Sequence, residues 1–368
     1  MVTVLLVVVV AMQGAPGRPA LPRGADPNDW QAYFDRGAEI LKRYPNRADS
    51  MFDWASRLDP SRAEPLAARW VAFWMRDISR FERYLTDDAT GLDSAAVRKA
   101  DTLFLRALQR NPFVPQTLVL LPFEKLPGDW QDNSLTLGWL AYSRQQYALA
   151  ASHFRQIIRR NPERNAWIRF DLALTFVPRR AFDSATVEMT ALLATLRARE
   201  DTEPSRVYQS KELTAYGIGL LHLVRGQTDS ARRFFEEAVV ENLAFFPAYA
   251  DLGDLALERG DRAIAAREFG HAAELAADDP WIQHRYGAAL LRMGRAVDAI
   301  AALEHAIALD PWYAEPYLML GIAWDQAGDK DAAAKALAQY VARAPRRDSD
   351  AIDDAKRRLA ALQAGDKP

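Results

Sequence analysis

Apolar residues recur along most of the chain with the period of an amphipathic helix, and small residues interrupt them at fixed intervals. In the stretch from Asp251 to Pro280, glycine and alanine stand at helical positions that could hold larger side chains. Shifting that stretch by 34 residues reproduces the pattern. The recurring small positions are Gly219, Gly253, Gly287 and Gly321, followed by Ala231, Ala265, Ala299 and Ala333. Recurrence at one spacing indicates an internal repeat.

Each repeat is predicted to hold two helices of about a dozen residues joined by a short loop, and therefore antiparallel. A large apolar residue comes four positions after each alanine, at Phe235, Phe269, Leu303 and Leu337. A glycine suited to a left-handed helix end lies between the two helices, at Gly226, Gly260, Gly294 and Gly328. Small residues at the crossing would let the backbones approach while Phe or Leu fills the space beside them. Because one unit cannot bury its apolar face alone, the units are expected to stack.

The repeat resembles the tetratricopeptide repeat (TPR) family, whose 34-residue signature has the same order of small and large positions. The closest matches are Gly253, Ala256, Ala265, Phe269 and Ala272, and then Leu320, Gly321, Trp324, Ala333 and Leu337. Looser matches precede them at Ala48, Phe52 and Ala55, at Ala100, Phe104 and Ala107, at Gly138, Ala150 and Phe154, and at Ala173, Ala185 and Met189. The resemblance implies an all-α, right-handed superhelical solenoid of antiparallel helix pairs, with about eight units in this chain.

The pattern also predicts the organisation of the whole chain. We expect a signal peptide at 1–17, a linker at 18–28, a degenerate repeat pair at 29–112 with an insertion at 77–94, a Pro-rich connector at 113–130, two repeats at 131–199, a polar insertion at 200–211, four regular repeats at 212–347, and a capping helix with a tail at 348–368. The capping helix is predicted because Ile352, Ala355, Leu359 and Leu362 form one apolar stripe that could cover the last repeat.

Composition excludes several classes of function. Hydrophobic residues make up 49% and charged residues 26% of the chain, which is typical of a globular protein. The formal net charge of −2 includes no excess of Lys and Arg for nucleic-acid phosphates, so no nucleic-acid partner is expected. The chain has no cysteine, which rules out thiolate zinc sites and cysteine nucleophiles.

The N-terminus predicts export. Val2 to Ala11 is an apolar run too short to span a bilayer but suited to the core of a signal peptide, and Ala15 to Gly17 offers small residues for cleavage before Arg18. The run lacks a preceding Lys or Arg, so an uncleaved membrane anchor and a buried cytoplasmic segment stay as alternatives. We expect an exported chain, periplasmic or secreted, whose only membrane contact would be this segment.

The sequence offers no candidate catalytic residues, metal ligands or cofactor site. Gly217 and Gly219 lack the strand and the third glycine of a dinucleotide-binding loop, which favours a packing role for both. His271 and His305 occupy equivalent repeat positions, but surface decoration is a simpler interpretation than a shared metal site. Asp278 and Asp279 are placed to cap a helix.

The concave surface is the candidate partner-binding site. In TPR proteins the first helix of each pair lines this surface, and the resemblance implies which positions point inward. These are Leu135, Trp139, Tyr142, Trp167, Phe170, Leu174, Tyr216, Leu220, Leu223, Trp281, His284 and Leu291. The set is largely apolar and rich in aromatic residues, which is typical of an interface. Two alternatives remain: the groove is open, or residues 113–130 fill it.

The prediction is therefore a non-catalytic scaffold that binds a protein or peptide segment, within an exported or envelope-associated assembly. A chaperone or carrier of apolar clients or lipids is the second hypothesis. An enzyme with an unrecognised site is the third, and the oligomeric state is left open.

Overall fold

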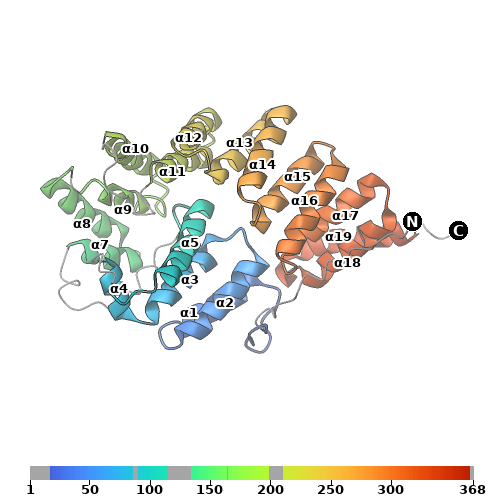
Figure 1. Cartoon of the computed structure of the whole chain (residues 1–368), viewed down its shortest axis with the longest axis horizontal. Coiled ribbons are helices and arrows are strands. Elements are labelled where there is room, and N and C mark those ends of the chain that lie inside the picture. The colour runs from blue at the N-terminus through green and yellow to red at the C-terminus, as the bar shows by residue number, and fades with distance from the viewer. Residues whose placement is uncertain (1–16, 86–89, 115–133, 164, 199–209, 365–368) are drawn as a thin grey trace.

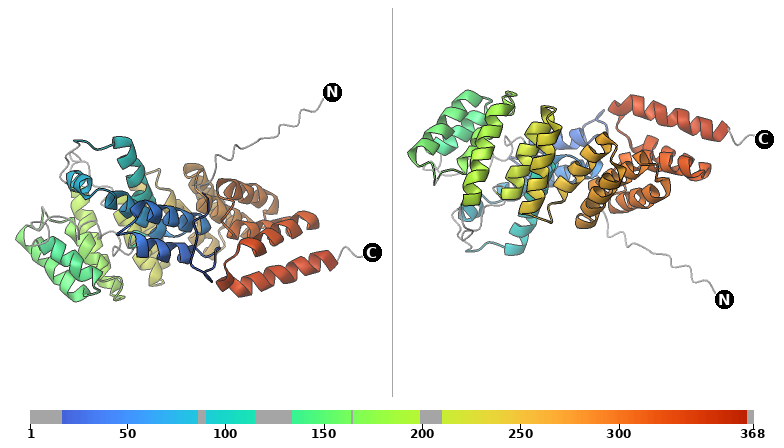
Figure 2. Two further views of the ribbon diagram at one scale, coloured as in Figure 1. Left: turned by 90° about the horizontal axis from the view of Figure 1, so that it is seen from below. Right: turned by 90° about the horizontal axis from the view of Figure 1, so that it is seen from above.

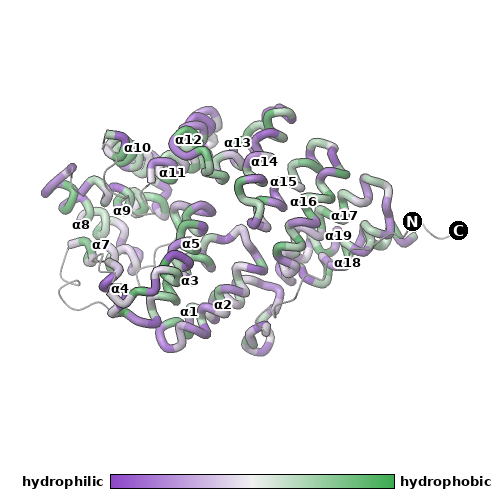
Figure 3. The backbone as a smooth tube through the Cα atoms, viewed as in Figure 1, coloured by the Kyte–Doolittle hydropathy of each residue, from purple (hydrophilic) through white to green (hydrophobic). Residues whose placement is uncertain are grey.

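The predicted all-α repeat solenoid is confirmed by the computed structural model of the chain. The structure describes residues 17–85, 90–114, 134–163, 165–198 and 210–364, and in these ranges every regular element is a helix. Helices α7 to α18 follow an arc, and α1 to α5 lie across its open side (Figure 1). Hydrophobic and hydrophilic residues alternate along the helices of the arc, as amphipathic packing requires (Figure 3).

The regular array consists of four helix pairs. Their bounds are α11 Lys211–Val224 with α12 Thr228–Glu241, α13 Phe246–Arg259 with α14 Arg262–Leu275, α15 Pro280–Arg292 with α16 Ala296–Leu309, and α17 Glu315–Ala327 with α18 Lys330–Arg343. The four turn glycines all have positive φ, from 71° at Gly226 to 90° at Gly328. Each turn therefore uses the left-handed conformation that glycine adopts without strain.

The crossing within each pair explains the small residues of the repeat. A Cβ atom built on Gly253 would lie 2.6 Å from the Phe269 ring, and one on Gly287 would lie 2.6 Å from Leu303 Cγ. Gly219 stands in the same relation to Phe235, and Gly321 to Leu337. The side chain of the second helix thus occupies the space that a larger residue on the first helix would need. Contact at this distance makes glycine a requirement of the crossing.

The two units before the regular array lose the glycine turn, and the first of them keeps the glycine crossing. Their helices are α7 Ser134–Ser143 with α8 Tyr147–Arg160, and α9 Ile168–Leu174 with α10 Phe182–Ala198. Gly138 packs on Phe154 as in the regular units. The turns are made by Gln145 and Arg180, with φ of 60° and 54°. A side chain at these angles costs about 1 kcal/mol, which accounts for the degenerate sequence signal at the turns.

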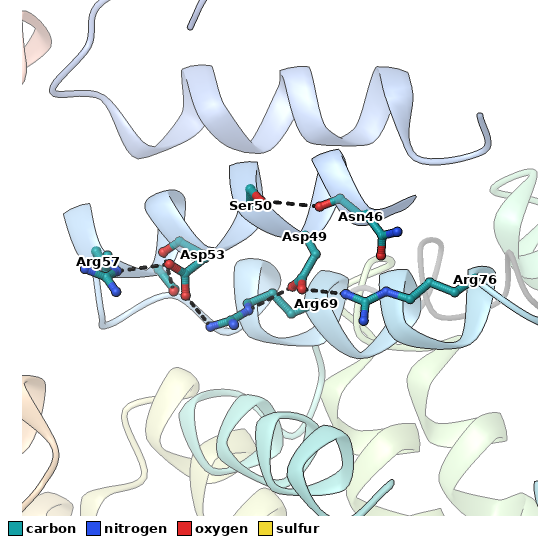
Figure 4. A network of polar contacts seen from close by, with 8 residues as sticks. Asn46, Asp49, Ser50, Asp53, Arg57, Arg69 and Arg76 are labelled. Atoms are coloured by element: carbon teal, nitrogen blue, oxygen red, sulfur yellow. Dashed lines mark hydrogen bonds and ion pairs between the residues drawn. The ribbon is translucent and has the colours of Figure 1, made fainter. Parts of the chain in front are cut away.

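The N-terminal part contains two further pairs, the second of them interrupted. Helix α1 Trp30–Ile40 packs on α2 Pro45–Leu58, and α3 Ala63–Met75 packs on α5 Ser94–Arg110, with α4 Ile78–Leu85 in the insertion between them. Gly37 contacts Phe52 at the α1–α2 crossing. Arg69 of α3 and Arg76, which follows its last residue, both hold α2. Arg69 pairs with Asp49 at 3.1 Å and Asp53 at 2.6 Å, and Arg76 pairs with Asp49 at 2.7 Å (Figure 4).

The C-terminal helix covers the end of the stack as predicted. After the short 3₁₀ turn η3 Arg346–Asp348, helix α19 Ser349–Ala364 packs on α18. Ala355 and Leu362 are buried, and Ile352 and Leu359 are partly buried against the same cluster. The apolar stripe read from the sequence is thus the face that α19 turns toward the last repeat.

The described N-terminal segment meets the C-terminal end of the repeat array, which the sequence did not predict. Seen from below, the N-terminal helices lie in front of the arc, and seen from above they lie behind it (Figure 2). Residues 18–28, expected as a linker, instead dock on the last repeat. Asn28 donates to the Ala342 carbonyl at 3.1 Å, and the Arg346 amide donates to Asp26 at 2.6 Å. Arg347 pairs with Asp29 at 2.7 Å.

The glycine crossing makes a prediction with an internal control. Gly287→Ala should lower the free energy of unfolding by about 1–3 kcal/mol, because its methyl group would overlap Leu303. Gly270→Ala, within α14, should raise it by about 0.5–1 kcal/mol, since a Cβ there meets nothing within 4 Å and alanine favours a helix. Denaturant unfolding of both variants measures these effects. Equal effects at the two positions would contradict this packing.

Candidate functional site: the seam on the concave face

The structure places all twelve predicted site residues on or next to the first helices of their pairs. Tyr142 is in α7, Phe170 and Leu174 are in α9, and Tyr216 is in α11, and these four are buried in the protein core. The other eight are half-buried: Leu135, Trp139, Trp167, Leu220, Leu223, Trp281, His284 and Leu291. Because a third of the set is core, the expected exposed apolar surface is smaller than the sequence suggested.

The C-terminal end of α5 enters the concave face between α11 and α15. Pro112 and Phe113 lie 3.7 Å and 3.3 Å from a Cβ position built on Gly217 of α11. Gly217 thus makes room for a neighbouring segment, and its partner in the Gly-x-Gly motif, Gly219, makes room for Phe235. Phe113 and Val114 begin the connector that was a candidate for filling the groove; residues 115–133 lie outside the described ranges. In the described part, α5 fills this section of the concave face.

Arg110 fixes this contact. Its guanidinium lies 4.2 Å from the centre of the Trp281 ring and forms an ion pair with Asp279. Its Nε donates to the Pro60 carbonyl at 3.0 Å. The Arg110 and Asp279 side chains are each only 3% exposed. The contact is therefore a buried, hydrogen-bonded charge pair, of the type whose disruption is strongly destabilising.

A second group of charges lies on α13 and α15. We call the contacts made by Arg110, Arg285, His284 and Glu315 the seam. Arg285 pairs with Asp251 at 2.8 Å and with Asp254, and Tyr216 donates to the other Asp251 oxygen at 2.8 Å. Burial raises the pKa of Tyr216 well above its usual value, and the Asp251 carboxylate adds to the shift, so the phenol keeps its proton. Charges and rings that pair in this way form an interface between repeats.

His284 belongs to this internal interface as well. Its Nδ1 lies 2.8 Å from the Tyr313 hydroxyl, and its Nε2 is buried without a hydrogen-bond partner in the described structure. Burial lowers the pKa of His284 to about 4, and the neighbouring Arg285 cation acts in the same direction. The imidazole is thus neutral at physiological pH and already bonded within the chain.

Glu315, at the start of α17, is a partly satisfied charge of the seam. Its Oε2 is buried and has no hydrogen-bond partner among the described residues. Burial raises the pKa of Glu315 to about 7, with the Asp59 and Asp348 carboxylates adding to the shift, while a backbone hydrogen bond and Arg347 oppose it. Ionisation of this carboxyl works against docking of the two ends.

The sequence held a signal for part of this seam. Asp251 and Arg285 are 34 residues apart, so opposite charges occupy the same position in successive repeats, where they face one another. Asp279 was expected to cap a helix, and it does accept from the Trp281 and Ile282 amides at the start of α15. Its pairing with Arg110 had no signal, because Arg110 lies in a degenerate unit 169 residues earlier.

An accessible cleft lies away from the seam. It is about 460 Å³ in volume, and its lining comes from α12, α13 and α14, with none from α1 to α5. We call it the outer cleft. Its apolar lining residues are Val239, Val240, Tyr249, Leu252, Leu255, Ala256 and Ile264. Charges at its edge pair with each other, as in Arg232 with Glu236 at 2.9 Å and Arg267 with Glu268 at 2.6 Å.

The described part of the chain was searched for clusters of metal ligands and for membrane-spanning helices. Within the described ranges, no three His, Asp or Glu side chains gather as metal ligands would. Over the same ranges, no helix has the length and apolar character needed to cross a bilayer.

The comparisons with known proteins support the repeat assignment. Sequence models of the tetratricopeptide repeat match residues 290–359 and residues 132–164. No curated protein matches the sequence.

Solved structures with a similar fold include YrrB, described as a TPR protein with an unusual peptide-binding site. It has 18% identity and a TM-score of 0.43, and the match covers 56% of this chain and 99% of that one. The C-terminal part of a TPR repeat-containing protein from Cytophaga hutchinsonii has 16% identity and a TM-score of 0.46, covering 63% and 96%. The APC/C hetero-tetramer Cut9–Hcn1 has 17% identity and a TM-score of 0.45, covering 88% and 63%.

Arg110 and Arg106 form a matched pair of tests one helical turn apart. Arg110→Ala should lower the free energy of unfolding by about 3–5 kcal/mol, because it leaves Asp279 buried without its cation. Arg106 pairs with Asp278, but these side chains are 39% and 72% exposed, so Arg106→Ala should cost less than about 1 kcal/mol. Denaturant unfolding of the two variants measures both losses of free energy of unfolding. Comparable losses would mean that α5 is not docked as described.

Glu315→Gln tests the pH dependence of the seam. A carboxyl whose folded-state pKa is raised contributes stability below its unfolded pKa of about 4.5, and that contribution is lost as the pH rises through about 7. Glutamine should therefore leave stability unchanged near pH 4.5 and raise it by about 1–2 kcal/mol near pH 8, after allowance for partial exposure. Melting of both proteins across this range measures the difference. A variant that gains nothing at pH 8 would show that the carboxyl is solvated.

Proposed function

We propose that this chain, which is a tetratricopeptide repeat protein, is a non-catalytic interaction scaffold that holds a segment of a partner protein in the outer cleft. The observation that supports this proposal is the contrast between the two faces of the array. On the concave face, the α5 end is locked in place by an arginine that is 3% exposed. On the other face, Val240 is 80% exposed and Ile264 is 43% exposed at the edge of a cleft with an apolar floor.

The shape of the outer cleft favours a helical segment as the bound partner. Helices α12 and α14 have 14 residues each, which is about 21 Å of helix, and α13 forms the floor between them. An amphipathic helix can lay its apolar face into such a groove. The cleft volume of about 460 Å³ lies in the range typical of ligand sites.

Charge contributes little to this proposed recognition. The edge of the cleft carries arginines and carboxylates that already pair with each other. A partner should therefore be anchored by apolar side chains, with its polar residues meeting an edge of mixed charge. The concave residues expected from the sequence to bind the partner, such as Trp281 and His284, instead belong to the seam in this proposal.

We also propose that the scaffold works outside the cytoplasm. This proposal rests on the apolar run from Val2 to Ala11 and the small residues that follow it. A docked protein segment in an envelope-associated assembly would be consistent with both proposals.

The proposed partner site can be tested by comparing two exposed apolar positions, Ile264 in the outer cleft and Val297 outside it. A photo-crosslinking residue at Ile264 should give one adduct of discrete mass with a partner, whereas the same residue at Val297, 74% exposed on α16 and outside the cleft, should not. Ile264→Glu should then weaken the captured partner at least about tenfold, since an anchor position loses more than about 1.4 kcal/mol. Val297→Glu is the control, and both variants should keep their melting temperature.

Two outcomes would overturn the scaffold proposal. Adducts of equal yield at both positions would place the partner elsewhere. Saturable uptake of unrelated apolar dyes and lipids by the wild type, abolished by Ile264→Glu, would favour a carrier of apolar clients instead.

A further inference from the structure

Three aromatic rings surround the guanidinium of Arg18 at the point where the two ends of the chain meet. The guanidinium carbon lies 5.8 Å from the Tyr33 ring centre, 5.3 Å from that of Trp54 and 5.1 Å from that of Trp312. Tyr33 comes from α1, Trp54 from α2 and Trp312 from the loop before α17. We call these three rings the aromatic cage. It exists only while the N-terminal helices are docked on the last repeats.

We propose that the aromatic cage is an exchangeable binding site for the arginine side chain of a partner protein, and that Arg18 is its ligand in the closed chain. This site is separate from the outer cleft and does not depend on the function proposed for it. The chemistry is that of cation recognition by ring faces, which is strongest for tryptophan and gains strength in a desolvated site.

The cage is rigid enough to serve as a site. Tyr33 and Trp54 are 1% and 2% exposed. The Trp54 and Trp312 rings are 5.2 Å apart at an interplanar angle of 64°, and those of Tyr33 and Trp54 are 6.4 Å apart and stacked. Each ring is therefore held by a neighbouring ring, so the cage does not need Arg18 to keep its shape.

The acceptors around the cation favour guanidinium over ammonium. Arg18 Nη2 donates to the Pro27 carbonyl and to the Asn28 side-chain oxygen. The planar guanidinium group of arginine can stack on aromatic rings and at the same time donate hydrogen bonds from its edge, whereas the ammonium group of lysine cannot. Both acceptors are neutral, and no ion pair of Arg18 with a carboxylate is present among the described residues.

Arg18 fits this site imperfectly, which makes exchange feasible. Its Nε is buried without a hydrogen-bond partner. An unsatisfied buried donor of this kind is costly. Residues 17–24 form no helix, and the hydrogen bonds to the C-terminal part begin at Ala25, so this stretch can open while Pro27 and Asn28 stay docked. Segments with few buried contacts open at low cost in free energy.

The test uses the full chain and the peptide acetyl-Gly-Arg-Pro-Ala-amide, which reproduces residues 17–20. Arg18→Met removes the guanidinium, so the Pro27 carbonyl and the Asn28 side-chain oxygen lose their donor and the arginine of the peptide can displace the uncharged side chain. Calorimetric titration should show the peptide binding to this variant at least about tenfold more tightly than to the wild type, whose cage is occupied. A Lys-containing peptide should bind more weakly than the Arg peptide.

Adding Trp312→Ala to Arg18→Met gives the matched control, since it removes one ring of the cage. Peptide binding should fall back to the level of the wild type. Equal binding to all three proteins, or none to Arg18→Met, would overturn the proposal. If circular dichroism shows that Arg18→Met is unfolded, Arg18→Ala takes its place with the same expectations.

A second copy of the chain could supply the same arginine. Light scattering of the wild type and of Arg18→Met separates this source from a partner protein. A monomer in both cases agrees with the proposal. A wild-type dimer that Arg18→Met abolishes would overturn the partner assignment and give the cage to Arg18 of the second copy.

Discussion

The buried ion pair of Arg110 and Asp279 is the constraint on which the arrangement of the whole molecule depends. Both side chains are 3% exposed, so neither charge can return to water without separating α5 from α15. While the pair is intact, the first helices of the chain lie on the concave face of the repeats that follow them (Figure 1). An open solenoid becomes a closed one, and the surface that an open repeat array would offer to a partner is used inside the chain.

Because the N-terminal helices dock on the concave face, the two faces of the repeat array have different roles. Trp281 and Asp279, at the start of a first helix, hold Arg110 of the N-terminal part, whereas the second helices leave the outer cleft accessible. The proposed partner site therefore lies where the array is free, and the aromatic cage lies where its ends meet. Because both Arg18 and Arg110 hold the closed form, a partner arginine that displaces only Arg18 would loosen one end and leave the buried pair intact.

The sequence predicted those parts of the structure that local spacing determines. Glycine opposite Phe or Leu, as in Gly253 and Phe269, is a contact between neighbouring helices, so the period of 34 residues reveals it. Closure was not predictable, because Arg110 and Asp279 are 169 residues apart and no pattern relates them. For the same reason, the sequence placed Tyr216 and Phe170 on the lining of a concave groove, either open or filled by residues 113–130, whereas tertiary packing buries both in the core. The expected linker at 18–28 looked unstructured because its contacts lie on the far end of the chain.

A double-mutant cycle between Arg110 and Asp279 tests the central claim most directly. Asp279→Asn keeps a side chain that can cap α15, so the cycle with Arg110→Met isolates the charge pair from the cap. If the N-terminal helices are docked on the concave face, the free energies of unfolding should show a coupling of about 2 kcal/mol or more. Additive effects, with a coupling of less than about 0.3 kcal/mol, would contradict closure of the array by this pair.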